Sequence, residues 1–320
     1  MTKETHKTFC RFCHAYCAIE VDVEDGRPIA VRGDTDDPVY GGYTCIKGRQ
    51  LPSQYSTPKR VSKTLKRSAG GDFHVIDIND AMDEIAAKVT HLIEQYGPRS
   101  VATYVGSYGY QNSAALHLAK AWHASVGSTS YYTSVTIDQP ARRIAASQFG
   151  TWDGGTHAFT GADVCMMVGN NPVVSQYTPF GGPPPFSPYA RLRAEMKKGM
   201  KVIVIDPRKT EVANRATLHL QVNPAEDPTL LSAIINFIFK HDLYDHEFCS
   251  HHLQDLEQLK QLVAPFTPEY AAARCNIAAD DLIAAAQIFA EANRGVAVTG
   301  TGPNMAPRAI LTEHLVLCLN

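Results

Sequence analysis

Four cysteines near the start of the chain constrain its fold more than any other feature. Cys10, Cys13, Cys17 and Cys45 are spaced Cys-x2-Cys-x3-Cys-x27-Cys. Four thiolates can hold one tetrahedral metal ion or one cubane [4Fe-4S] cluster. Structural zinc usually takes two Cys-x2-Cys pairs, whereas here three cysteines are crowded together and the fourth stands alone. The spacing therefore favours a [4Fe-4S] cluster, with a zinc site and unmetallated thiols as the alternatives.

Composition excludes several other classes of protein. A formal net charge of -2 over 320 residues argues against binding nucleic acid through its phosphates. No apolar run is long enough to span a bilayer, and the first residues carry no export signal. Eight cysteines in such a chain indicate a reducing compartment, so we expect a cytoplasmic protein. The four remaining cysteines are expected to be buried thiols: Cys165, Cys249, Cys275 and Cys318.

The cysteines flank a predicted β-hairpin over residues 18–32, with its turn at Asp25-Gly26. Residues 1–60 should therefore form a small antiparallel cluster domain. From residue 61 strands and helices alternate, beginning with a helix that Asp80 caps and Gly97 ends. Strands are predicted at residues 101–105, 164–168, 202–205, 218–222 and 296–299, and helices at 113–127, 189–198, 230–239, 282–290 and 309–319. Residues 181–185 are expected to be a loop. The alternation predicts doubly wound, mostly parallel, Rossmann-like α/β units.

Polar and glycine-rich loops follow four of these strands. Ligands of open α/β sheets bind outside the carboxyl ends of the strands. Together these loops favour a large phosphate-bearing ligand, although each alone reads equally as an ordinary turn, and none has a clean G-x-G-x-x-G. The loop residues with binding chemistry are Gly106, Asn112, Gly169, Asn170, Asn171, Asp206, Pro207, Arg208, Gly300, Gly302 and Asn304.

Together these motifs resemble the dimethyl sulfoxide reductase family of molybdenum or tungsten enzymes. The resemblance covers the whole chain, which is similar to only the N-terminal half of such an enzyme. The resemblance rests on the cysteine spacing, on Cys45-Ile-Lys47-Gly, and on the loops at residues 169–172 and 206–208. It implies a [4Fe-4S] cluster and a bis-molybdopterin guanine dinucleotide. It also implies that Lys47 lies between cluster and pterin on the electron path; otherwise Lys47 is a solvated surface residue.

The resemblance extends to Asp227, which would accept hydrogen bonds from a guanine edge. Many family members have Pro-Gly-Thr-Asp where this chain has Pro224-Ala-Glu-Asp227. Asp227 could also serve as the N-cap of the helix that follows, and both roles can coexist.

The protein ligand to molybdenum is where the chain departs from the family. Residues 131–140 hold no cysteine, which argues against formate dehydrogenase and the periplasmic or assimilatory nitrate reductases. By position Asp138 is the first candidate ligand and Ser134 the second. Asp138 could instead cap the next helix.

The resemblance implies four segments: residues 1–60 (cluster), 61–135 (first half of an interrupted α/β domain), 136–300 (guanine dinucleotide) and 301–320 (start of the return). A C-terminal β domain would be absent, and this piece alone should bind the cofactor poorly. The implied function is two-electron redox or oxo transfer on a small molecule, with electrons relayed through the cluster to an electron-transfer protein or subunit. One alternative is a non-catalytic iron–sulfur relative without molybdenum, like the large iron–sulfur subunit of respiratory complex I. Another is a zinc-stabilised α/β binding protein.

Overall fold

The computed structural model describes residues 3–13, 15–106, 109, 112–150, 161–175 and 188–320. The loop predicted at residues 181–185 lies outside this set. The chain divides into two compact units, Met1–Thr136 and Ile137–Asn320. Each is described by itself.

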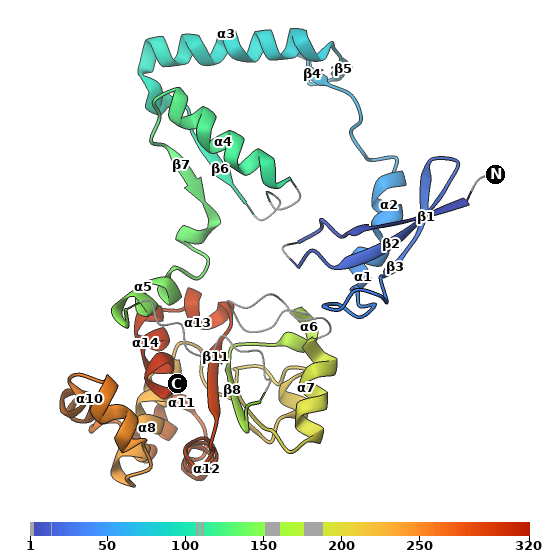
Figure 1. Ribbon diagram of the computed structural model, residues 1–320. Coiled ribbons are helices and arrows are strands. Elements are labelled where there is room, and N and C mark those ends of the chain that lie inside the picture. Colours follow the sequence, from blue (N-terminus) through green and yellow to red (C-terminus); the bar gives the residue numbers. More distant parts are fainter. Residues whose placement is uncertain (1–2, 14, 107–108, 110–111, 151–160, 176–187) are drawn as a thin grey trace. The chain divides into compact units, whose positions relative to one another are not determined.

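Unit 1 begins with a three-stranded antiparallel sheet in the order β1-β2-β3 (Figure 1). Its strands are β1 (Lys3–Phe9), β2 (Ala18–Glu24) and β3 (Arg27–Gly33), followed by the helices α1 (Ile46–Arg49) and α2 (Leu51–Ser56). The predicted hairpin is confirmed. Asp25 and Gly26 form its turn, both with positive φ (47° and 74°), as a tight right-twisted hairpin requires. The strand β1 was not predicted, because all its residues are exposed and it lacks an apolar alternation.

The rest of unit 1 combines a short hairpin, two longer helices and a two-stranded parallel sheet. The elements are β4 (Leu65–Arg67), β5 (Phe73–Val75), α3 (Ile78–Tyr96), η1 (Pro98–Ser100), β6 (Thr103–Val105), α4 (Ser113–Ser125), β7 (Tyr131–Thr133) and η3 (Ser134–Thr136). Two predictions need correction. Asp77, not Asp80, caps α3, since the Asp77 side chain accepts from the backbone N–H of Asn79. The strand at 101–105 is shorter and not buried: β6 pairs only with β7, and Tyr104 is 64% exposed.

Unit 2 contains a four-stranded parallel sheet in the order β10-β9-β8-β11. Its strands are β8 (Val164–Val168), β9 (Lys201–Ile205), β10 (Leu218–Leu220) and β11 (Gly295–Thr299). The helices are α5 (Pro140–Gln148), α6 (Pro172–Ser175), α7 (Pro188–Lys197), η4 (Ala213–Arg215), α8 (Asp227–Lys240), α9 (His246–His252), α10 (Leu256–Val263), α11 (Pro268–Cys275), α12 (Ala279–Ala290), α13 (Thr301–Met305) and α14 (Ala309–Leu319). The predicted parallel α/β architecture is confirmed.

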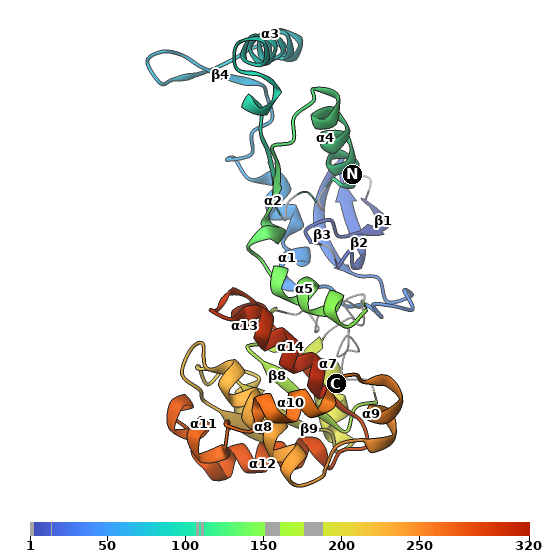
Figure 2. The same cartoon turned by 90° about the vertical axis from the view of Figure 1, so that its left-hand side faces the viewer.

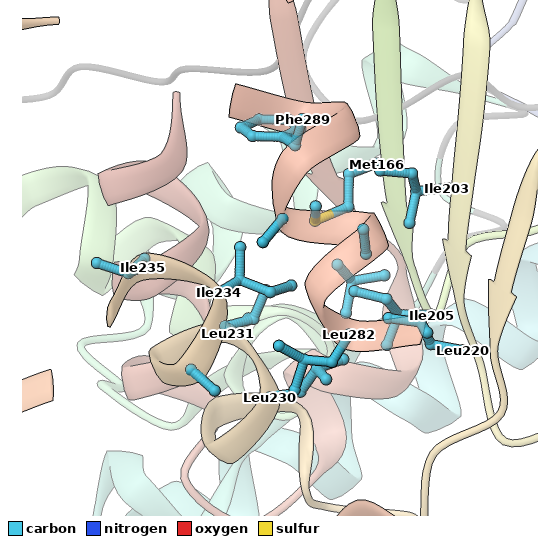
Figure 3. Close-up of a cluster of buried hydrophobic side chains, with 14 of the residues drawn as sticks. Met166, Ile203, Ile205, Leu220, Leu230, Leu231, Ile234, Ile235, Leu282 and Phe289 are labelled. Carbon is cyan, nitrogen blue, oxygen red and sulfur yellow. The ribbon is translucent and has the colours of Figure 1, made fainter. Parts of the chain in front are cut away.

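Helices cover both faces of this sheet, so alternate residues of each strand enter different cores. Met166 and Ile203 face α8 and α12, while Met167 and Val202 pack toward Leu192 of α7. Figure 1 shows α7 on one side of the sheet and α8 with α14 on the other, and Figure 2 turns the same unit by 90°. Figure 3 shows the larger core, where Leu230, Leu231 and Ile234 of α8 meet the sheet. Burial on both faces explains the uninterrupted apolar strands.

Two of the four scattered cysteines differ from the prediction. Cys165 and Cys275 are fully buried, but Cys249 and Cys318 are only partly buried, because Cys249 lies on α9, which has no buried residue, and Cys318 lies at the end of α14. No helix among the described residues has both the length and the apolar character needed to cross a membrane.

Candidate cofactor sites

The four N-terminal cysteines come from two segments of unit 1. Cys10, Cys13 and Cys17 lie in the loop between β1 and β2, and Cys45 immediately precedes α1. The backbone N–H of Cys10 donates to the carbonyl of Cys17 at 2.8 Å, which closes the loop. Cys13 and Cys45 lie close enough to both of these residues to raise their pKa values electrostatically. The fold thus brings the four predicted ligands near one another.

Burial is the main property of the two inner thiols. Cys10 and Cys17 are 5% and 7% exposed, and both pack against Ile19 and Val31. Desolvation raises the pKa of Cys17 to about 12. It also raises the pKa of Cys10, although a hydrogen bond from the backbone N–H of Phe12 lowers that pKa in part. Thiols in such a setting stay protonated until a metal displaces the protons. Among the described residues, no three histidine, cysteine or acidic side chains are close enough to share a single metal ion.

The segment after Cys45 packs directly on the thiols. A Cβ on Gly48 would lie 2.3 Å from Oγ1 of Thr44 and 3.6 Å from Sγ of Cys10, so a larger residue does not fit. Lys47 is exposed, and its Nζ lies 5.7 Å from the ring centroid of Phe12. Its charge lowers the pKa of Cys10. Lys47 is therefore an exposed cation beside Cys10, and its predicted role on the electron path stays a prediction.

The strand order of unit 2 creates a topological switch point between β8 and β11. The chain runs outward from β8 to β9 and β10, then returns to place β11 on the other side of β8. At such points the loops leaving neighbouring strands diverge and open a ligand site at the carboxyl edge. The loops that begin at Gly169 and Gly300 leave these two strands, and the loops at Asp206 and residues 221–226 leave the other two.

Gly169 and Gly300 touch through their backbones. A Cβ on Gly300 would lie 2.1 Å from the carbonyl oxygen of Gly169, and a Cβ on Gly169 would lie 2.4 Å from Cδ of Pro303. Gly169 also has a φ of +56°, which glycine adopts without strain. Gly302, in contrast, has open space around it. The first two glycines are required for packing of the loops.

Amide and charged side chains line the same edge. Asn170 donates from Nδ2 to the carbonyl of Thr299 at 3.4 Å, which joins the loops of β8 and β11. Asn171 donates from Nδ2 to Glu211 at 2.7 Å, but its Oδ1 is buried and has no hydrogen-bond partner among the described residues. Arg208 donates to the same Glu211 carboxylate at 3.3 Å. Sequence reasoning missed Glu211, whose only signal was its position shortly after Arg208.

Asp206 and Pro207 form the turn after β9. Oδ1 of Asp206 accepts from the backbone N–H of Arg208 at 2.8 Å, and Pro207 is exposed. His219 of β10 contacts the Asp206 carbonyl at 3.0 Å through Nε2. The Asp206 carboxylate therefore stands at the strand end with its orientation fixed by its own turn.

Asp227 is a buried carboxylate at the first position of α8. The cap position belongs to Glu226, so the interpretation of Asp227 as N-cap is wrong: helix α8 begins at Asp227 itself, one residue earlier than that interpretation needs. Desolvation raises the pKa of Asp227, and the nearby Asp206 and Glu226 raise it further. The backbone N–H of Asp227 donates to this carboxylate, and no described side chain donates to it. A buried carboxylate with so few donors is suited to a ligand that supplies N–H groups.

Asn304 is engaged inside the protein. Its Oδ1 accepts from the backbone N–H of Arg142 at 3.1 Å, while Nδ2 donates to the Gly300 carbonyl at 3.2 Å and to Glu313. Arg142 and Glu313 are themselves buried, and Arg142 reaches Oγ1 of Thr299 at 3.5 Å. This network, which sequence reasoning did not identify, ties α5 and α14 to the loop after β11.

The two candidate metal ligands belong to different units. Asp138 lies in unit 2 and is exposed; Gln139, with φ of +60°, occupies the cap position of α5, so the interpretation of Asp138 as a cap is wrong. Gln139 donates to Oγ1 of Thr301 at 3.1 Å, which places the Asp138 segment beside the loop of β11. Ser134 begins η3 in unit 1 and is partly buried.

The loop after β6 is described only in part. Gly106 and Asn112 are exposed, and the Asn112 side chain makes no cap bond to α4. These two residues belong to unit 1.

Comparison with known proteins identifies both halves of this arrangement. A sequence model described as "Molybdopterin oxidoreductase Fe4S4 domain" matches residues 3–56, and one described as "Molybdopterin oxidoreductase" matches residues 60–308. The chain belongs to the molybdopterin oxidoreductase family. This confirms the resemblance drawn from the motifs, and the match at residues 3–56 favours a [4Fe-4S] cluster over zinc.

Relatives of this family match nearly the whole chain. The thiosulfate reductase molybdopterin-containing subunit PhsA of Salmonella typhimurium is 26% identical over 319 residues, 98% of this chain and 40% of that protein. A nitrate reductase of Symbiobacterium thermophilum is 30% identical over 307 residues, 88% of this chain and 38% of that protein. In fold, the chain matches acetylene hydratase from Pelobacter acetylenicus with a TM-score of 0.84 at 21% identity, covering 98% of this chain and 42% of that one. The chain thus spans about two-fifths of the length of these relatives.

The residues present fit the cofactors of the family. In unit 1, the four gathered thiols would ligate the irons of the cluster, one cysteine to each. In unit 2, the Oδ1 of Asn171, to which no described residue donates, the close-packed glycine backbones and the buried Asp227 lie after strands of the parallel sheet and are suited to such a cofactor. The family therefore assigns an iron–sulfur cluster and a molybdopterin cofactor to this chain.

Proposed function

We propose that this chain forms part of the catalytic subunit of a molybdopterin oxidoreductase that uses the guanine dinucleotide form of the cofactor. The observation that carries the proposal is the set of three loops after β8, β9 and β10, which place Asn171, Asp206, Arg208 and Asp227 on one edge of the parallel sheet. When bound, the cofactor supplies a metal centre that exchanges two electrons, with or without an oxygen atom, with a small-molecule substrate.

Each loop has a distinct task in this proposal. The Asp227 carboxylate accepts from the two N–H donors of a guanine edge, which would relieve its unfavourable burial. Asp206 accepts from ribose hydroxyls, and Arg208, exposed and beside Glu211, faces a phosphate. Gly169 and Gly300 let the backbone approach the ligand closely. Asn170 and Asn304 hold the loops together through their described hydrogen bonds, and Gly302 has open space in which a ligand could approach the backbone.

The thiolates of four cysteines would hold the cluster, which would supply one-electron transfer: Cys10, Cys13, Cys17 and Cys45. Lys47 provides a fixed positive charge beside Cys10, which favours the reduced cluster and raises its potential. A partner protein or subunit would accept or supply these electrons. All eight cysteines are free, which supports our proposal of a cytoplasmic location.

Asp138 remains our first candidate for the protein ligand to the metal. It is exposed, and its neighbour Gln139 is bonded to the loop after β11, within the same unit as the parallel sheet. Ser134 is the second candidate. A carboxylate oxygen is a hard ligand and suits a high-valent metal.

The test is a chemical inventory of the full-length protein that contains this chain, purified without oxygen. We expect four irons, one molybdenum or tungsten, pterin that fluoresces after oxidation, and GMP released by acid hydrolysis. Four irons without pterin would replace the proposal with a non-catalytic iron–sulfur relative, which the missing cysteine ligand favours. Pterin without GMP would exclude the dinucleotide form.

A further inference from the structure

The turn between β10 and α8 contains a residue in a backbone conformation that side chains rarely adopt. Ala225 has a φ of +71°. In this left-handed region the Cβ of an L-residue crowds its own backbone, and glycine is the residue that avoids the strain. Something in the surrounding structure must therefore hold the turn in place.

Glu226, the next residue, is bound by a fork of two hydrogen bonds. Arg274 at the end of α11 donates to its carboxylate from Nη2 at 2.6 Å and from Nε at 3.2 Å. Thr229 donates to the same carboxylate at 2.6 Å. The Arg274 bonds hold the pKa of Glu226 below its usual range. A bidentate guanidinium–carboxylate pair fixes direction as well as distance.

Arg308 connects this carboxylate to the strained residue itself. Its Nη2 donates to the Ala225 carbonyl at 3.2 Å and lies 4.0 Å from Oε1 of Glu226. On the other side, Asn223 donates from Nδ2 to the Arg274 carbonyl at 3.0 Å and from its backbone N–H to the Cys275 carbonyl at 2.9 Å. The turn is thus fastened before and after Ala225 to α11 and to the start of α14.

The residue that follows is Asp227, whose carboxylate is buried and bonded to no other described side chain. Among the described residues, no side-chain hydrogen bond sets the direction in which this carboxylate points, so the backbone of its turn has a large part in setting it. We propose that Glu226, Arg274 and Arg308, here called the Glu226 clamp, hold the left-handed Ala225 turn and thereby aim the Asp227 carboxylate. The clamp is a positioning device. The identity of the ligand that Asp227 receives rests on the function proposed above.

The claim that the clamp supports the Ala225 turn is tested on full-length protein made without the cofactor. Glu226→Thr should lower the thermal midpoint by about 3 °C or more, and Ala225→Gly should raise it by about 1–3 °C. In the double variant Ala225→Gly/Glu226→Thr, the fall in thermal midpoint caused by Glu226→Thr should be less than half of the fall it causes alone, because an unstrained turn needs less support. Glu195→Thr is the matched control. Glu195 pairs with Lys198 at 2.9 Å and its side chain is 16% exposed, against 15% for Glu226.

The positioning side is tested on protein made with the cofactor. Glu226→Thr should reduce the GMP recovered per chain after gel filtration about tenfold, since a small misplacement of the carboxylate removes both hydrogen bonds. Adding Ala225→Gly should restore most of it. Glu195→Thr should retain GMP like the parent.

The outcomes separate the two proposals. If Glu226→Thr loses no more stability than Glu195→Thr, or if Ala225→Gly does not reduce its loss, the clamp does not exist. If the coupling is present but the variants retain GMP equally, the clamp does not aim Asp227. If the parent itself yields no GMP, the proposed dinucleotide site fails, whereas the thermal coupling still decides the clamp.

Discussion

Gly300 approaches Gly169 so closely that a Cβ on Gly300 would lie 2.1 Å from the Gly169 carbonyl oxygen and 3.0 Å from Cα of Asn170. The two residues end neighbouring parallel strands, and their backbones lie at the candidate site. Because both contacts are with backbone, a larger residue cannot be accommodated by turning a side chain.

Gly300→Ala should therefore lower the free energy of unfolding by about 2 kcal/mol or more. Gly302→Ala is the control, since nothing lies within 4 Å of that position and it falls inside α13. Urea unfolding of both variants measures the difference. Equal stability of the two would mean that the loops do not touch as described.

Asp227→Asn should raise stability at neutral pH while abolishing guanine retention. Burial raises the pKa of Asp227 above its ordinary value of 3.8, so the folded state favours the protonated form. That contribution is present below pH 3.8 and is lost as pH rises through the elevated pKa. The thermal midpoints of parent and variant should therefore differ at pH 7 and converge near pH 3.5 or below. A constant difference across this range would contradict the burial of a charge.

Cys45→Ala should reduce iron from four atoms per chain to almost none, because the fourth ligand of the cluster is removed. Cys249→Ala is matched in chemistry but lies on α9 of unit 2, partly buried, and should leave iron unchanged. Iron analysis with the visible absorbance of the cluster measures both. A full complement of iron in Cys45→Ala would exclude this residue as a ligand.

Asn304→Ala should cost about 2 kcal/mol or more of stability, because it removes the buried hydrogen bonds that Asn304 makes to the backbone N–H of Arg142 and to the Glu313 carboxylate. Denaturant unfolding of cofactor-free protein measures this. If Asn304 instead acts by contacting the cofactor, the variant would unfold like the parent and lose only pterin.

The parallel sheet of unit 2 could be predicted because its strands are buried on both faces. Val164–Val168 is an unbroken apolar run, and so short a run between turn signals is typical of a strand buried on both faces. The edge strand β1 could not, since Lys3–Phe9 is exposed throughout. Helix α11 was missed although Thr267 and Pro268 carry a start signal, with the Thr267 hydroxyl accepting from the N–H of Tyr270.

The candidate site, too, could be predicted only in part. Motif spacing was enough to gather the four cysteines and the loops after β8 and β9. The clamp partners of Glu226 come from Arg274 and Arg308, 48 and 82 residues further along the chain, and only the fold brings them together. Asp138 and Ser134 stay predictions, because no contact of either one distinguishes a ligand from an ordinary turn residue.

The small sheet of unit 1 has a further consequence for the life of the protein. Four described residues form its buried hydrophobic core, and two of them are Cys10 and Cys17, so predicted ligands of the cluster are themselves half of the hydrophobic centre. Oxidative damage to the cluster would consequently be damage to the folding core. A chain that had lost its iron would present an opened N-terminal segment to proteases, and redox injury would be converted directly into protein turnover.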